Sequence, residues 1–341
     1  MMRRCVIPAV AVCMAVCAVA EAFDTMRSTK KTFSGGRIVK MSPLEISYEK
    51  SGISTEVPVN EIVMVIYDDE PTSLNIARIA VTNGRYEDAL AALEKINLDD
   101  VERLEIKQDV AFYKAFCAAK LAMAGEGDIA TAGRQMATFV NECKGNYHWL
   151  EANEVVGDLL VATRKYAAAE TYYGTIGKAP WPDYKMRAGV AIGRALLAQG
   201  KPEEATKYFE SVLGMQAEGE LANFQRMSAM LGKARCLAEA KQYDEAIKLV
   251  QDIIAKADGE EVELHARAYN TLGTALKKAG KTKEALLAFL HVDVLYFSIP
   301  DAHAEALANL AELWNELHET ERATRAQQTL KERYKNSPWT Q

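Results

Sequence analysis

The sequence lacks the motifs that usually mark a catalytic or redox centre. No glycine-rich phosphate loop, Cys-x-x-Cys, His-Glu-x-x-His or Gly-x-Ser-x-Gly occurs among its 341 residues. These motifs place phosphate-binding amides, metal ligands or an activated serine at fixed spacings. Carboxylates are plentiful, but no pair stands out as a general acid and base. We therefore expect no catalytic residues, no cofactor and no enzyme activity.

Histidine is scarce as well, with five residues in the whole chain. His291 and Asp293 come closest to a metal-ligand pair, but a separation of two places their side chains on different faces of a helix. Asp301, His303 and Glu305 are typical of a solvated first turn of a helix. The sequence therefore predicts no metal site.

Long apolar runs are confined to the N-terminus. Residues 6–20 are uncharged and apolar, follow Arg3 and Arg4, and precede Ala20-Glu21-Ala22. This order is typical of a signal peptide with a small-residue cleavage site, and the run is too short to span a bilayer comfortably. We expect residues 1–22 to be removed, so that the exported chain begins at Phe23 in the periplasm or cell envelope. An uncleaved anchor is the alternative.

Cysteine is too sparse for a disulfide framework, because three of the six residues lie in the predicted leader. Cys117, Cys143 and Cys236 remain. Cys117 and Cys143 are expected on antiparallel helices on the order of 12 Å apart along the axes, whereas a disulfide needs Cα atoms within about 7 Å. We expect buried free thiols.

Residues 23–70 have a different pattern from the rest of the chain. Between residues 33 and 68, four runs rich in β-branched and aromatic residues alternate with turn signals such as Gly35-Gly36 and Ser51-Gly52. They predict four or five short strands in a small, partly closed barrel or curled meander. The segment resembles the Sm-like small barrels that precede helical repeats in some bacterial exported proteins.

Some members of such barrel families bind RNA, but this module lacks the features that binding requires. Lys30, Lys31, Arg37 and Lys40 have no aromatic residues interleaved as a stacking platform, and the chain carries a net charge of −6. We expect no nucleic-acid partner. The module is expected to cap the first helix or to provide a surface for self-association.

An alanine recurs at intervals of 36–43 residues from residue 73 onward. Its seven positions are Ala89, Ala132, Ala169, Ala205, Ala246, Ala285 and Ala323. Twelve residues before six of them stands another small residue; these are Ala77, Gly157, Gly193, Ala234, Gly273 and Ala311. Lys120 replaces it in the second repeat. A large side chain usually follows four residues after the alanine. Two antiparallel helices approach within about 8–10 Å only where contact residues are small, so the pattern predicts seven helical hairpins.

The repeats resemble the tetratricopeptide repeat family at their hinges and signature alanines, as in GRYEDAL (84–90), GKPEEAT (200–206) and GKTKEAL (280–286). Pro202, Tyr86, Tyr166 and Tyr243 are expected to begin second helices. The resemblance implies an α-solenoid over residues 71–338 that is mainly helical. The period is nearer 39 residues than the family's basic 34, so a HEAT-like array is the alternative.

The resemblance also implies a concave groove, lined by the first helix of each hairpin, that holds a peptide or protein. The repeat register assigns six residues to its middle: Arg187, Arg194, Arg235, Arg267, Asn270 and Lys277. They are mostly basic and would suit an acidic peptide or a C-terminal carboxylate. The alternative is that they are ordinary solvated charges, some of them paired across neighbouring repeats.

The sequence therefore predicts a non-catalytic interaction scaffold or adaptor in the cell envelope. A structural component of an envelope assembly, joined through the β module, is the second hypothesis. An enzyme with an unrecognised site is a remote third.

Overall fold

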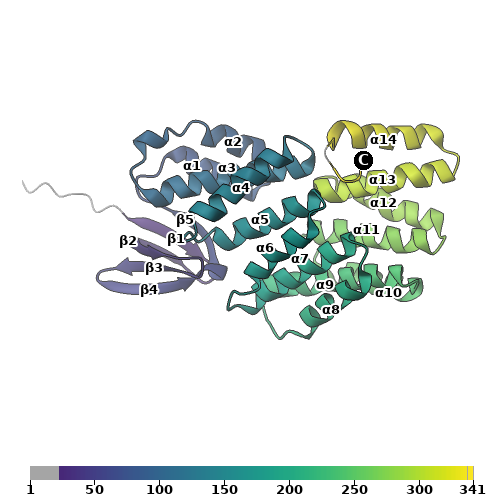
Figure 1. Cartoon of the computed structure of the whole chain (residues 1–341), viewed down its shortest axis with the longest axis horizontal. Coiled ribbons are helices and arrows are strands. Elements are labelled where there is room, and N and C mark those ends of the chain that lie inside the picture. Colours follow the sequence, from purple (N-terminus) through teal and green to yellow (C-terminus); the bar gives the residue numbers. More distant parts are fainter. Residues whose placement is uncertain (1–22, 336, 341) are drawn as a thin grey trace, which may run out of the picture.

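A five-stranded antiparallel sheet precedes fourteen helices in the computed structural model, which describes residues 23–335 and 337–340 (Figure 1). The predicted signal peptide lies outside the described residues. The strands are β1 (Asp24–Ser28), β2 (Thr32–Met41), β3 (Glu45–Lys50), β4 (Ile53–Pro58) and β5 (Ile62–Ile66), in the order β4-β3-β2-β1-β5. The sequence pattern predicted the later four strands but missed β1, because its inward residues include a buried aspartate, Asp24, instead of an apolar side chain.

The sheet bends along β2. The first half of β2 pairs with β1 and the second half pairs with β3. Gly35 adopts a φ of +74°, and a Cβ on Gly36 would lie 2.2 Å from the carbonyl oxygen of Glu49. Only glycine fits this close approach. β4 and β5 form the two edges of the sheet. Of the two predicted forms, the sheet is therefore the curled meander, and β5 returns to pair with β1.

The fourteen helices form seven hairpins, the number that the alanine spacing predicts. Their bounds are α1 (Thr72–Thr82) and α2 (Tyr86–Leu93); α3 (Leu104–Ala124) and α4 (Ile129–Glu142); α5 (Trp149–Ala162) and α6 (Tyr166–Ile176); α7 (Pro182–Ala198) and α8 (Pro202–Gly214); α9 (Glu220–Glu239) and α10 (Tyr243–Lys256); α11 (Val262–Lys278) and α12 (Thr282–Leu295); α13 (Pro300–Glu316) and α14 (Thr320–Arg333). The predicted second-helix starts at Tyr86, Tyr166, Pro202 and Tyr243 are confirmed.

Small residues form the contact inside most hairpins, as the pattern predicts. All seven repeat alanines are buried, with at most 3% of the residue exposed. A Cβ on Gly157, Gly193 or Gly273 would lie 2.4–2.7 Å from the aromatic ring that follows the alanine by four residues. The ring therefore occupies the space that the missing side chain leaves. Ala311 is half-buried and departs from the pattern.

The β module and the first two hairpins share one core. Ile46 and Val57 from the sheet pack in the same cluster as Leu74 of α1 and Val110 of α3. Arg103, just before α3, donates to the buried Asp24 carboxylate from Nη1 at 2.6 Å and from Nη2 at 3.0 Å. The module therefore packs against the first hairpins and covers the end of the solenoid that would otherwise face solvent.

The three cysteines of the described chain are unpaired and buried, as expected. Burial raises the pKa of the Cys117 thiol to about 12, and it also raises the pKa of Cys143 and of Cys236. These thiols stay protonated at neutral pH and behave as small apolar groups. None of the described helices combines the length and the hydropathy needed to cross a bilayer.

The solenoid curls until its last hairpin meets its second (Figure 1). Helix α13 contacts α3, and Gly125, in the longer α3–α4 turn, lies against the backbone of Tyr334 after α14. The two segments are more than 200 residues apart in sequence. Repeat arrays usually rely on contacts between neighbouring repeats alone, so this contact adds a long-range restraint. A cavity of about 670 Å³ lies beside it.

Replacing Gly125 with alanine is expected to open this contact. The new Cβ would lie 2.7 Å from the Tyr334 Cα, and Gly125 has a φ of +98°. We expect the free energy of unfolding to fall by about 2–4 kcal/mol, since a steric term adds to the backbone strain. Gly127→Ala is the matched control, because Gly127 has a φ of +103° but open space at its Cβ position. Equal losses of stability in urea unfolding would contradict a role for the contact.

Candidate functional site

The six predicted groove residues all lie on first helices of the hairpins. Arg187 and Arg194 are on α7, Arg235 is on α9, and Arg267, Asn270 and Lys277 are on α11. The curvature of the solenoid brings distant repeats to the same inner surface. Charges on α5, α11 and α13, namely Asp158, Glu263, Arg267 and Asp301, all influence the pKa of Arg194. We call this region the inner surface.

Four of the six residues form ion pairs with acids on other helices. Arg187 pairs with Glu154 on α5, and Arg235 pairs with Glu305 on α13. Lys277 pairs with Glu312 and donates to Asn309 at 3.1 Å. The pairs of Arg187 and Lys277 join neighbouring repeats, as in the alternative that the sequence left open, whereas the pair of Arg235 joins the fifth hairpin to the seventh.

Arg267 is the fourth paired residue, and it has two acidic partners. Its Nε lies 2.9 Å from Glu263 one turn earlier, and its Nη2 lies 2.9 Å from Asp301 on α13. Burial is the largest single effect on Asp301 and raises its pKa, but Arg267 and the other lowering contacts together outweigh it. The pKa of Asp301 is therefore lowered, because a nearby positive charge favours the carboxylate. The last two hairpins are thereby joined through charge.

The structure buries Asn270, which corrects its assignment to the accessible groove. The residue is fully buried, and its Nδ2 donates to the Ala302 carbonyl at 2.8 Å. Its register on the first helix is as predicted, but α13 covers it. Asn270 therefore joins α11 to α13 and is not accessible to a partner.

Arg194 differs from the other five residues. In the described part of the chain its side chain has neither a hydrogen-bond nor an ion-pair partner, although it is half-buried. Burial, followed by the positive charge of Arg267, lowers the pKa of Arg194 to about 10. The guanidinium stays charged at neutral pH but is incompletely solvated. A carboxylate placed here would form a charge-assisted pair that the chain itself does not supply.

An acidic strip on α5 lies near this arginine, since Asp158 acts on the pKa of Arg194. Glu151, Glu154 and Asp158 are spaced to share one face of the helix. Burial and the neighbouring Glu154 raise the pKa of Asp158 to about 6, and the Tyr173 hydroxyl donates to it at 2.8 Å. The repeat register also assigns these three acids to the inner surface, in the third repeat, so acidic residues of α5 accompany the basic residues of α7, α9 and α11.

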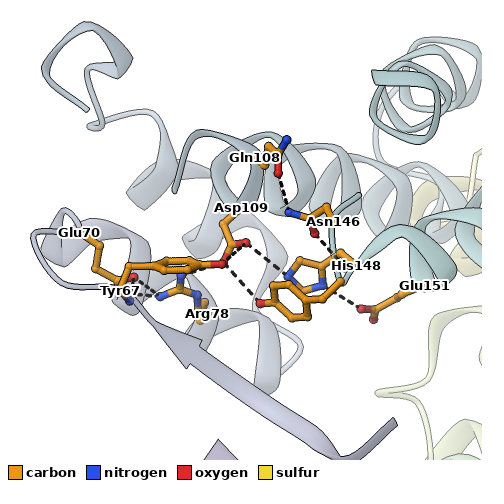
Figure 2. A network of polar contacts seen from close by, with 9 residues as sticks. Tyr67, Glu70, Arg78, Gln108, Asp109, Asn146, His148 and Glu151 are labelled. Carbon is orange, nitrogen blue, oxygen red and sulfur yellow. Dashed lines mark hydrogen bonds and ion pairs between the residues drawn. The ribbon is translucent and has the colours of Figure 1, made fainter. Parts of the chain in front are cut away.

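A buried polar network where the β module meets the helices escaped the sequence analysis (Figure 2). Arg78 of α1 is 2% exposed. Its Nη1 contacts both carboxylate oxygens of Glu70 at 2.6 and 2.8 Å, and its Nη2 lies 2.8 Å from Asp109 of α3. The three acids at residues 68–70 suggested only a favourable helix start, but Glu70 is a partner of this arginine. An arginine directly after the contact residue Ala77 was the available signal.

Aromatic side chains complete this network. The hydroxyls of Tyr67 and Tyr147 donate to Asp109 at 3.5 Å. His148 stacks on Phe112 with centroids 3.8 Å apart, and its Nδ1 lies 3.3 Å from Glu151. These contacts connect strand β5, α1, α3 and the start of α5, while Arg78 Nε and His148 Nε2 remain without a hydrogen-bond partner in the described chain. A cavity of only about 180 Å³ adjoins them. The arrangement indicates a structural junction.

The described residues contain no group of three or more histidine, cysteine, aspartate or glutamate side chains placed to hold a metal ion. The chemistry of the inner surface is that of charge pairing and hydrogen bonding. The residues of this surface come from first helices of the hairpins.

The fold defines an α-solenoid of helix-turn-helix repeats. Residues 190–262 match the family model described as tetratricopeptide repeat, which favours this family over a HEAT-like array. The helical part of the chain thus has the fold of a tetratricopeptide repeat solenoid. A search of curated protein sequences found no match.

Solved structures with this fold include three that are 14–16% identical to the chain. A tetratricopeptide repeat protein from Parabacteroides merdae has a TM-score of 0.51 at 15% identity, over 77% of this chain and 92% of that one. A Rap protein complexed with competence and sporulation factor has a TM-score of 0.54 at 14% identity, covering 77% and 74%. The apo quorum sensor NprR from B. thuringiensis has a TM-score of 0.56 at 16% identity, covering 76% and 74%. At such low sequence identities, the structural likeness shows a shared fold.

Proposed function

We propose that the protein is a non-catalytic scaffold of the cell envelope that binds a peptide or protein on the inner surface of its solenoid. The observation that carries the proposal is Arg194, a half-buried cation without a partner in the described chain. A carboxylate of the partner, from an acidic side chain or a C-terminus, pairs with it. The fold itself supports a role in protein interaction, and the Rap neighbour was solved in complex with a factor.

The acidic strip on α5 adds a second requirement for the partner. Glu154 is neutralised by Arg187, whereas Asp158 has a hydrogen bond from Tyr173 and no ion pair of its own in the described chain. A partner that spans the inner surface therefore meets a basic point at Arg194 and an acidic point at Asp158. A short segment with both charges fits better than a uniformly acidic one.

A photo-crosslinking residue at Ala198 tests the binding surface. Ala198 is exposed and lies one helical turn after Arg194, on the same face of α7. In the native envelope we expect a discrete crosslinked partner from this position. The matched position is Arg325 on the outer side of α14, which is also exposed and should give no such product.

Arg194→Glu, combined with the Ala198 crosslinker, tests the role of the charge. We expect the adduct to fall by at least about tenfold, since removing a charge-assisted pair and adding repulsion costs more than 1.4 kcal/mol. Arg325→Glu in the same background should leave it unchanged. An undiminished adduct in the Arg194→Glu chain would remove the arginine from the binding surface.

The proposed location in the cell envelope has its own test. Recovery of a chain beginning at Phe23 from the envelope fraction would support this location, and an intact Met1 would count against it.

A further inference from the structure

A small aromatic pocket lies where the inner surface of the solenoid meets the β module. It is the cavity of about 180 Å³ beside the buried polar network. Its lining combines Val59, Ile62 and Val63 of the β module with side chains from α1, α3, α7 and the start of α5. These helical side chains include five aromatic rings and one carboxylate, those of Phe112, Tyr113, Phe116, Tyr147, Tyr184 and Glu151. We call this cavity the aromatic pocket.

The charge of the aromatic pocket is that of Glu151. Among the described residues that line it, one has a carboxylate and none is a lysine or an arginine. Glu151 lies beside His148, whose Nδ1 is 3.3 Å from its carboxylate (Figure 2). Burial raises the pKa of Glu151, but the hydrogen bond from His148 and nearby positive charges outweigh burial and lower it, so the group is ionised at neutral pH. An occupant that covered this carboxylate without pairing with it would leave a buried unpaired charge, which is costly.

The rings of the pocket already attract cations of the chain itself. Lys120 Nζ lies 5.1 Å from the centroid of Phe116, and Arg187 Cζ lies 5.7 Å from that of Tyr184. Both distances are in the range of cation–π contacts. Neither cation is among the described residues that line the pocket, and Arg187 is paired with Glu154. The pocket therefore has the chemistry of a cation site, and the described chain does not place a cation in it.

We propose that the aromatic pocket holds an arginine or lysine side chain of the protein or peptide that the inner surface binds, an inference that rests on the proposed function. The aliphatic stem of that side chain packs against Val63 and Val81, and its charged head lies between the rings and Glu151. A cavity of about 180 Å³ is smaller than the roughly 300–1,000 Å³ of sites for drug-sized molecules. It accommodates one side chain.

The place of the pocket also sets the position of this basic residue in the partner. Tyr184 lines the pocket, and Arg194 follows ten residues later on the same helix, α7. Ten residues of helix rise by about 15 Å, and an extended segment covers that length in about four or five residues. A partner whose carboxylate pairs with Arg194 therefore presents its basic residue about four or five positions from that carboxylate.

Selection from a library of random dodecapeptides with free C-termini, with the full chain as bait, tests the charge and the spacing together. We expect the enriched peptides to carry arginine or lysine about four or five positions from an aspartate, a glutamate or the C-terminus. Arg194→Glu should weaken their binding at least about tenfold, because this arginine pairs with the carboxylate.

A synthetic copy of one enriched peptide, measured by isothermal titration calorimetry, isolates the pocket. Its basic residue is replaced with a neutral one of similar length, citrulline for arginine or norleucine for lysine, and the dissociation constant should rise at least about tenfold. Glu151→Gln, which keeps an acceptor for His148, should weaken the original peptide to a similar degree. The two changes together should cost no more than either alone, because they remove the same contact. Glu142→Gln alters an exposed carboxylate of α4 and should bind the original peptide as the parent does.

The outcomes separate this inference from the proposed function. Peptides that depend on Arg194 but have no basic residue at that spacing would overturn the pocket assignment and leave the proposed function standing. A neutral peptide that binds as tightly as the original, or an unchanged affinity in the Glu151→Gln chain, would do the same. If no selected peptide depends on Arg194, both are overturned.

Discussion

Asp109→Ala is expected to lower the free energy of unfolding by about 3–5 kcal/mol. Asp109 is fully buried and accepts from Arg78 Nη2 at 2.8 Å, as well as from the hydroxyls of Tyr67 and Tyr147. Its removal leaves the Arg78 guanidinium buried with one partner fewer. The cost comes mainly from that incompletely compensated charge, because the attraction in the intact pair is largely offset by desolvation.

Urea unfolding followed by circular dichroism measures this effect. Asp252→Ala, an exposed carboxylate on α10, is the control and should change stability by less than about 0.5 kcal/mol. Glu70→Gln combined with Arg78→Met and Asp109→Leu removes all three buried charges of the junction at similar volume, and we expect this triple variant to be more stable than Asp109→Ala alone. A loss below about 1 kcal/mol for Asp109→Ala would show that water reaches the junction and replaces the carboxylate.

Gly273→Leu is expected to destabilise the sixth hairpin by about 3 kcal/mol. Gly273 of α11 faces Phe289 of α12, and a Cβ there would lie 2.7 Å from two carbons of the ring. Phe289 is fully buried and has no room to retreat. The two helices would have to separate, which breaks the contact that defines the hairpin.

Gly133→Leu is the matched control for this substitution. Gly133 also lies inside a helix, α4, but a Cβ there meets nothing within 4 Å. Leucine has a better helix propensity than glycine, so we expect this variant to gain about 0.5–1 kcal/mol. Opposite signs for the two variants in urea unfolding would establish that the contact, not helix propensity, selects glycine at position 273. A similar gain in both would refute the close approach.

Features that depend on neighbouring residues were readable from the sequence. Within one hairpin, a small residue on the first helix meets an alanine and a large residue on the second, at fixed separations of twelve and four. The spacing alone therefore predicted the contact between Gly273, Ala285 and Phe289. The hinge positions were less uniform. Gly280 has a φ of +74°, but Lys241 takes the equivalent position at +63° without glycine, so glycine marks only some of the turns.

The sequence predicted which helices carry the residues of the candidate binding surface, but not which of those residues keep an unpaired charge. The repeat register placed Arg187, Arg194, Arg235, Arg267, Asn270 and Lys277 correctly on first helices, because register is a local property. Which of them keep an unneutralised charge depends on residues 30–70 positions away. Glu305 neutralises Arg235, and α13 buries Asn270. Arg194 has no such partner in the described chain, and nothing in its sequence neighbourhood indicated this.

The sequence by itself determined seven helical hairpins, their hinges and the β segment before them, because each of these follows from the spacing of side chains along a short stretch. Only the tertiary structure decided the curl that brings Gly125 to Tyr334, the burial of Arg78 with Asp109, and the exposure of Leu287 and Val294 on α12. These features depend on the rotation between successive hairpins. A small rotation accumulates over seven hairpins, and no single repeat encodes its sum.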